Sequence, residues 1–145
     1  MPNQQYRVPM STSSVVLVKN TTLTAAQVNA LTTTPVILIP GVSGKSTSLL
    51  QFNITYNFGS TAFTVLDFTS VFSLNQGPDN GFTSQIMKSF CDQPSSQIAL
   101  NESLAIISFP LSDIQGSPIT VNNTGTASSG GSGSTVTFNL LYTLL

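Results

Sequence analysis

The sequence of 145 residues has very few charged side chains and no histidine. Charged residues make up 6% of the chain, whereas an ordinary soluble domain has about 25%. Its four basic residues are scattered, which excludes the basic patch that nucleic-acid or membrane-surface binding requires. Without histidine, neither a serine nor a cysteine has the usual base that activates it as a nucleophile. We therefore expect no nucleic-acid partner, no membrane partner and no serine- or cysteine-dependent hydrolase.

Cysteine and long apolar runs are also scarce. A single cysteine, Cys91, excludes an intramolecular disulfide, and we expect it to be a small buried apolar side chain. Zinc and copper sites need clusters of histidine and cysteine, and Asp79 in the turn PDNG is only a fragment of a calcium site. We expect no metal, no cofactor and no small-molecule substrate. No apolar run reaches the roughly 18 to 20 residues of a membrane helix, and the first residues lack a signal-peptide pattern, so a soluble chain is expected.

Hydroxyl and amide side chains take the place of the missing charges. Serine, threonine, asparagine and glutamine together supply 60 of the 145 residues. Charged, mixed surfaces keep free monomers soluble. A nearly uncharged, hydroxyl-rich surface therefore indicates a protein that functions inside an assembly.

Residues 39–47, IPGVSGKST, end like a phosphate-binding Walker A loop but lack its other features. That motif needs a glycine where Ile39 stands and a helix after the loop, but a strongly alternating segment follows. The same stretch approaches a nucleophile elbow around Ser43, with Lys45 in place of the last glycine and no histidine in the chain. We predict a glycine-rich hairpin or corner between two strands, with no catalytic residue.

Short apolar runs recur about every 8 to 12 residues, a spacing typical of an antiparallel β-sandwich or barrel. The segment LLQFNITYNF (49–58) alternates strictly between apolar and polar residues. We expect its apolar residues to face inward: Leu50, Phe52, Ile54, Tyr56 and Phe58. The last segment does the same with another set: Val136, Phe138, Leu140, Tyr142 and Leu144. Because it is apolar to its end, we expect it in the middle of a sheet or at a subunit contact. LAIISF (104–109) is predicted as a further strand.

A short helix is predicted near residues 24–31. Thr24 and Gln27 have the spacing of a capping box, and Pro35 ends any helix before it. We divide the chain into a flexible or docking arm at 1–13 and a single β-sandwich domain at 14–145. Within that domain, the Gly/Ser-rich segment 124–134 is predicted to be a mobile loop that cannot pack. Asp67, in TAFTVLDF, is expected to be a hydrogen-bonded carboxylate at a strand end.

The order of these elements resembles a known family. A TAAQVNAL helix leads into TPVILIPGVSGK, a long alternating strand with NFGSTAF follows, and VTFNLLY closes the chain after the Gly/Ser loop. This resembles the small β-sandwich cement, or decoration, proteins on the capsids of tailed bacteriophages. The resemblance implies an all-β, antiparallel, jelly-roll-like sandwich without enzymatic activity. It also implies a homodimer or homotrimer, made in the host cytoplasm, that binds the capsid exterior of the virion and clamps neighbouring major capsid subunits.

The alternative is a carbohydrate- or receptor-binding sandwich module of a tail or head fibre. Such a module should carry aromatic side chains at loop tips beside acids or amides, and Phe82, after PDNG, is the only obvious candidate in the sequence. The residues that we predict to contact a partner are Tyr6, Arg7, Phe82 and Tyr142. No family residue carries over, because no catalytic or ligand motif matches.

Overall fold

The fold is an all-β sandwich, as predicted, and it has a second short helix besides the predicted one near residues 24–31. The computed structural model describes residues 15–65, 67–77, 81–100 and 114–145, without the side chains of 81–86. The first sheet has four antiparallel strands in the order β1 (Val16–Thr24), β10 (Thr135–Leu144), β3 (Thr47–Asn57) and β7 (Gln97–Leu100). The second has the order β2 (Val36–Ile39), β8 (Ile119–Asn123), β5 (Val71–Gln76) and β6 (Gly81–Ile86). The smaller elements are β4 (Phe63–Thr64), β9 (Ser129–Gly130), α1 (Ala25–Ala30) and α2 (Lys88–Cys91).

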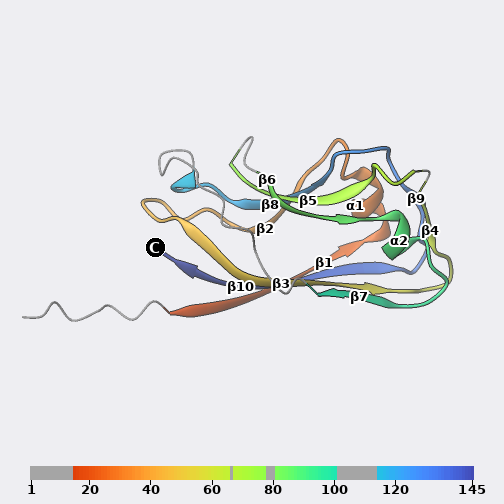
Figure 1. The fold of residues 1–145 in the computed structure, drawn as a ribbon, viewed down its shortest axis with the longest axis horizontal. Coiled ribbons are helices and arrows are strands. Elements are labelled where there is room, and N and C mark those ends of the chain that lie inside the picture. The colour runs from red at the N-terminus through yellow and green to blue at the C-terminus, as the bar shows by residue number, and fades with distance from the viewer. Residues whose placement is uncertain (1–14, 66, 78–80, 101–113) are drawn as a thin grey trace, which may run out of the picture.

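The strand pairing is that of a jelly roll. β1 pairs with β10, β2 with β8, β3 with β7 and β5 with β6, so that the chain is folded over as one long antiparallel ribbon. The ribbon is then divided between two sheets that face each other (Figure 1). Both helices and the small β4–β9 sheet lie toward one end of the sandwich (Figure 1). This arrangement confirms the predicted jelly-roll-like sandwich.

The core is formed by the inward side chains of the two sheets. Phe138 of the first sheet meets Phe72 of the second edge-on, with the ring centroids 5.5 Å apart. Other fully buried side chains come from both sheets: Leu23, Ile54, Tyr56, Leu38, Leu74 and Val121. Each such apolar side chain contributes about 1.5–3 kcal/mol when it is fully buried. Cys91 is also fully buried, as predicted.

The predicted alternation of β3 is confirmed except at its first member. Phe52, Ile54 and Tyr56 are buried, and Phe58 packs against the core. The prediction for Leu50 is wrong, because Leu50 is 46% exposed. The register between β3 and β10 shifts at this point, so Leu49 rather than Leu50 lies opposite Tyr142. A β-bulge of this kind adds one residue to one strand and reverses the pattern beyond it.

The predicted position of the last strand is confirmed. β10 lies between β1 and β3 and pairs with both over most of its length. Its inward side chains Val136, Phe138 and Leu140 are buried. An apolar strand in the middle of a sheet has its backbone groups paired on both sides, which explains why it needs few polar residues.

The helix and the glycine-rich turn follow their sequence signals. The Thr24 side chain accepts from the backbone N–H of Gln27, and the Gln27 side chain accepts from the backbone N–H of Thr24, as a capping box requires. After β2, the backbone N–H of Lys45 donates to the carbonyl of Val42, and Gly44 has a φ of 72°. This turn is a corner, because it carries the chain from the second sheet to the first.

The Gly/Ser segment 124–134 is packed in this structure, which the composition did not indicate. Ser128 and Ser134 are buried, and β9 pairs with β4. The Ser134 hydroxyl donates to the carbonyl of Thr61 and accepts from the backbone N–H of Gly59. Its predicted mobility stays a prediction. The predicted strand 104–109 and Asp79 lie outside the described residues.

Candidate functional site

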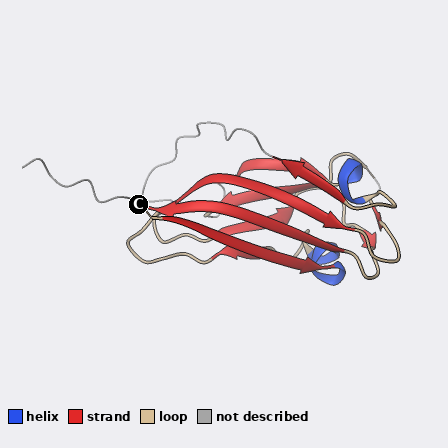
Figure 2. Cartoon of the chain, turned by 90° about the horizontal axis from the view of Figure 1, so that it is seen from below, coloured by secondary structure: helices blue, strands red, loops and turns tan. Residues whose placement is uncertain are grey.

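The outer surface of the first sheet is the largest regular surface that the described strands form. Three rows of side chains, defined by the strand register, cross it. We call these three rows, together with Val16, the neutral face. The rows are Val18–Leu141–Gln51, Asn20–Asn139–Asn53–Leu100 and Thr22–Thr137–Thr55–Ile98. Figure 2 shows the strands of this sheet from outside, with no helix lying across them.

No charged side chain belongs to the neutral face. β3, β7 and β10 contain no charged residue at all. The one charge on β1, Lys19, lies opposite Leu140 and so on the other side of the sheet from Val18 and Asn20. An inward-pointing lysine on an edge strand hinders the edge from pairing with another strand. The edge is therefore protected by charge, while the face is left free of it.

Amide and hydroxyl side chains occupy the centre of the neutral face. The Asn139 Nδ2 atom donates to Oδ1 of Asn53 at 2.6 Å. The hydroxyl oxygens of Thr22 and Thr137 are 2.9 Å apart and share a hydrogen bond. Such cross-strand pairs stabilise the sheet and fix the side-chain positions. The amides and hydroxyls are both donors and acceptors, so they have further capacity to bond a partner.

Two apolar groups border this polar centre at opposite corners. On β1, Val16 and Val18 are 53% and 68% exposed, and on β7, Ile98 and Leu100 are 60% and 63% exposed. A shallow hollow of about 200 Å³ lies beside the first group, lined by Val18, Gln51, Asn53, Asn139, Leu140 and Leu141. Exposed apolar side chains grouped on one surface are a common feature of sites that contact another macromolecule.

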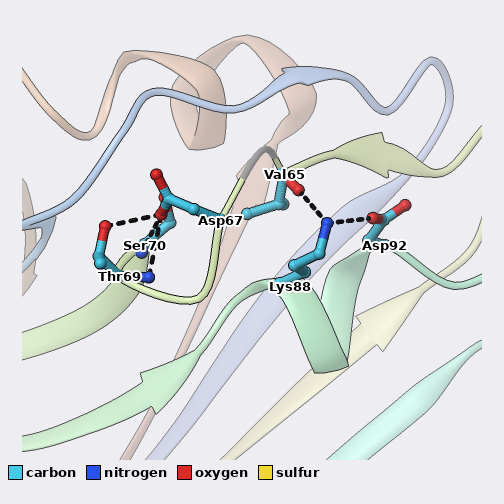
Figure 3. Close-up of polar contacts among 6 residues, drawn as sticks. All are labelled: Val65, Asp67, Thr69, Ser70, Lys88 and Asp92. Carbon is cyan, nitrogen blue, oxygen red and sulfur yellow. Dashed lines mark hydrogen bonds and ion pairs between the residues drawn. The ribbon is translucent and has the colours of Figure 1, made fainter.

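Three of the five charged residues that the structure describes, Asp67, Lys88 and Asp92, lie at the end of the sandwich near α2. The Asp67 carboxylate accepts hydrogen bonds from the backbone N–H groups of Thr69 and Ser70 and from the hydroxyl group of Thr69 (Figure 3). It also accepts one from the hydroxyl group of Thr126. Hydrogen bonds from Thr69 and then from Thr126 are the main causes that lower the pKa of Asp67 to about 2. The prediction of a hydrogen-bonded carboxylate is confirmed, but Asp67 lies in the turn between β4 and β5 and not at a strand end.

Lys88 holds the start of α2 to the end of the β4 segment. Its Nζ atom donates to the carbonyl of Val65 at 2.8 Å and lies 3.5 Å from a carboxylate oxygen of Asp92 (Figure 3). The same atom lies 5.8 Å from the centre of the Phe68 ring. These contacts lie within one end of the sandwich, so the charges of Lys88 and Asp92 serve internal structure.

A hollow of about 410 Å³ opens beside this cluster. Its lining consists of Phe68, Lys88, Ser89, Asp92, Gln93 and Gln97. Phe68 is 63% exposed. An exposed aromatic ring beside a carboxylate and two amides is the arrangement expected of a glycan-binding module, and the sequence reasoning missed it. Its available signal was the segment DFTS, in which an aspartate followed by hydroxyl residues favours a turn that exposes the intervening phenylalanine.

The structure describes only part of the predicted contact set. Tyr142 lies on the inner side of β10, opposite Leu17 and Leu49, and is partly buried against the core. Phe82 lies in β6, and its side chain is outside the described part, as are Tyr6 and Arg7. The contact roles of these four residues stay predictions.

Other kinds of site have little support in the described part of the chain. It contains no group of three or more histidine, cysteine, aspartate or glutamate side chains that could hold a metal ion. Burial raises the pKa of the Cys91 thiol, which makes it a poor nucleophile. None of the helices in the described ranges is long and apolar enough to cross a membrane.

Comparison with known proteins finds a distant similarity to a solved structure. No protein-family model matches the chain, and no curated protein matches it. Among solved structures, the chain is similar to a chain described as "Cyanophage Pam1 capsid asymmetric unit", with 12% sequence identity and a TM-score of 0.46. The match covers 92% of this chain and 86% of that chain. At this identity and TM-score, the similarity does not establish a shared function.

Proposed function

We propose that this chain is a non-enzymatic structural protein of a virion. In this proposal it is a cement or decoration protein that binds the outer surface of the head and clamps neighbouring major capsid subunits. The observation that carries the proposal is the neutral face, an exposed sheet surface without charge and with apolar side chains at two corners. Free monomers avoid such surfaces, and assemblies cover them.

The jelly-roll strand pairing supports the proposal that the assembly is a viral capsid. The resemblance in element order implies a jelly-roll-like sandwich, and the chain has that strand order. The full sequence contains no histidine, which leaves the usual serine and cysteine nucleophiles without a base. The partners in this proposal are a second or third copy of the chain and the major capsid protein. The arm at 1–13, with Tyr6 and Arg7, is a further segment that we propose to order on a partner.

The experiment that tests this function is binding to heads of the virus that encodes the chain, purified without this protein. We expect saturable cosedimentation, with a number of bound copies that matches a symmetry class of the shell. We also expect bound protein to raise the temperature at which the heads release their DNA, measured by dye fluorescence. Absence of binding at micromolar concentrations would contradict the proposal. Binding without any rise in the release temperature would contradict the clamping role.

One observation favours a second candidate, a glycan- or receptor-binding module. It is the hollow beside Phe68, with Asp92, Gln93 and Gln97 in its lining. Aromatic rings stack on the apolar faces of sugars, and carboxylates and amides bond their hydroxyls. NMR titration with a panel of oligosaccharides tests it. Shifts confined to this lining, and lost in Phe68→Ala, would support it, and a spectrum unchanged at millimolar glycan would exclude it.

A further inference from the structure

We infer that the neutral face is the surface through which two copies of this chain pair, sheet against sheet, around a two-fold axis. This deepens the proposed function and rests on it, since it names the surface that the oligomer would use. The occupant is a second copy of this chain. Three observations favour it over another partner: the absence of charge, the placement of the apolar groups and the area of the face.

The absence of charge makes the face compatible with itself. Two identical charged surfaces bring like charges together, which costs several kcal/mol and disfavours pairing. None of the four strands contributes a charged side chain to the neutral face. Its central amides and hydroxyls, among them Asn53 and Asn139, each donate and accept hydrogen bonds. A second copy therefore presents matching donors and acceptors.

The apolar groups are placed so that a two-fold axis can superpose them. The β1 group of Val16 and Val18 and the β7 group of Ile98 and Leu100 lie at opposite corners, with the polar rows between them. In an isologous contact, if one residue of the first copy touches a different residue of the second copy, the same two residues also touch with the copies exchanged. An axis that lies between the two stacked faces can thus place each β1 group against the β7 group of the other copy. Both apolar groups are then buried by one contact.

The area of the face is near what a specific dimer requires. With strands about 4.8 Å apart and about 3.3 Å per residue, the whole outer surface of the sheet, of which the neutral face is the greater part, presents on the order of 500 Å² on each copy. Pairing would bury about 1,000 Å² in total, which is at the lower limit for a specific interface. The expected dimer is therefore reversible, with a dissociation constant in the micromolar range. Adjacent bound copies on a lattice would raise the effective concentration further.

The test is sedimentation equilibrium of the full chain and matched variants up to about 500 µM, a range that detects micromolar pairing. We expect the native chain to form dimers that 1 M NaCl does not weaken, because the contact is uncharged. Val18→Asp and Ile98→Lys should each weaken pairing at least about tenfold, since each would bury an unpaired charge. Ile37→Lys is the control for Ile98→Lys, because Ile37 is a similarly exposed residue on a strand of the other sheet.

Mixing the two face variants separates a true contact from a folding defect. In the mixture, the carboxylate introduced by Val18→Asp would meet the ammonium group introduced by Ile98→Lys, so pairing should recover and become sensitive to salt. A native chain that stays monomeric throughout, or face variants that pair like the native chain, would overturn the inference. A native monomer that still binds heads, and loses that binding in Val18→Asp, would also overturn it. That last result would leave the proposed function standing, whereas a chain that neither pairs nor binds heads would contradict both.

Discussion

The neutral face and the end near α2 use polar side chains in opposite ways. At the α2 end, Asp67 and Lys88 bind atoms of the same chain, and their bonds close two loops onto the body of the sandwich. On the neutral face, Asn53 and Asn139 bond only sideways along the sheet, and the apolar corners have nothing over them among the described residues. Charged side chains thus hold loops in place at the α2 end, whereas no side chain of the neutral face is charged.

The first and largest expected effect is on the neutral face. Asn139→Asp introduces a charge at the centre of the face, where pairing would bring two carboxylates close together. We expect dimerisation to weaken about a hundredfold, which corresponds to about 2.7 kcal/mol. The melting temperature should change little, because the new carboxylate still accepts a hydrogen bond from the amide of Asn53 if that amide turns over. Sedimentation and thermal unfolding of the same samples measure the two effects.

Ile37→Asp is the control for that change, because Ile37 is exposed on β2 of the other sheet, away from the neutral face. It adds the same charge at a similar exposed strand position. Equal losses of pairing in the two variants would mean that overall charge, and not the neutral face, governs association. The neutral face would then have no special role in pairing compared with the rest of the surface.

The second expected effect is on stability and belongs to the α2 end. Lys88→Met keeps the length of the side chain but removes its bonds to the carbonyl of Val65 and to Asp92. We expect the free energy of unfolding to fall by about 1–2 kcal/mol, because the carbonyl of buried Val65 loses a charged donor. Pairing should be unchanged. Denaturant unfolding checks the first statement and sedimentation the second.

Lys45→Met removes the same charge from an exposed turn and serves as the matched control. Its effect on unfolding should stay within about 0.5 kcal/mol, as for most surface substitutions. If Lys88→Met were equally mild, its contacts would contribute nothing measurable. If it weakened pairing as well, the two regions would not be independent.

Local signals in the sequence predicted local structure well. The capping box at Thr24 and Gln27 is complete within four residues, and the alternation from Phe52 to Tyr56 needs only the period of a strand. The central position of β10 followed from a strand that is apolar to its end. Each of these depends on neighbours in the chain or on a single pattern, and so each was accessible before any fold was known.

Features that depend on distant partners were missed. Leu50 turns outward because of a register shift against β10, about ninety residues away along the chain. Ser134 is buried because its hydroxyl meets Gly59 and Thr61, which composition does not reveal. The neutral face could not be predicted without the strand order, because its three rows combine residues from four strands that are separated in the sequence. The hollow beside Phe68 needed the position of α2, since Lys88 and Ser89 of that helix line it.

The last and smallest effect is the response of the α2 end to acid. The pKa of Asp67 is lowered to about 2 by hydrogen bonds from Thr69 and Thr126, and an unfolded aspartate has a pKa of about 3.9. A carboxylate with a lowered pKa stabilises the folded state fully above the unfolded pKa, and the stabilisation is lost as pH falls toward the folded pKa. Between about pH 4 and pH 2, the native chain should therefore lose more stability than Asp67→Asn, which has no carboxylate to protonate.

Two single changes sharpen this prediction, and NMR titration of the Asp67 carboxyl carbon reads both. Thr69→Val should raise the pKa of Asp67 more than Thr126→Val does, because hydrogen bonding from Thr69 is the larger cause of the lowered pKa. Pairing through the neutral face should keep its strength in both variants at neutral pH, where Asp67 stays ionised. An unchanged pKa of Asp67 in Thr69→Val would show that the Thr69 hydroxyl does not cause the lowered pKa. A loss of pairing in either variant would connect the charged end to the neutral face, although the bonds of Asp67 involve no residue of that face.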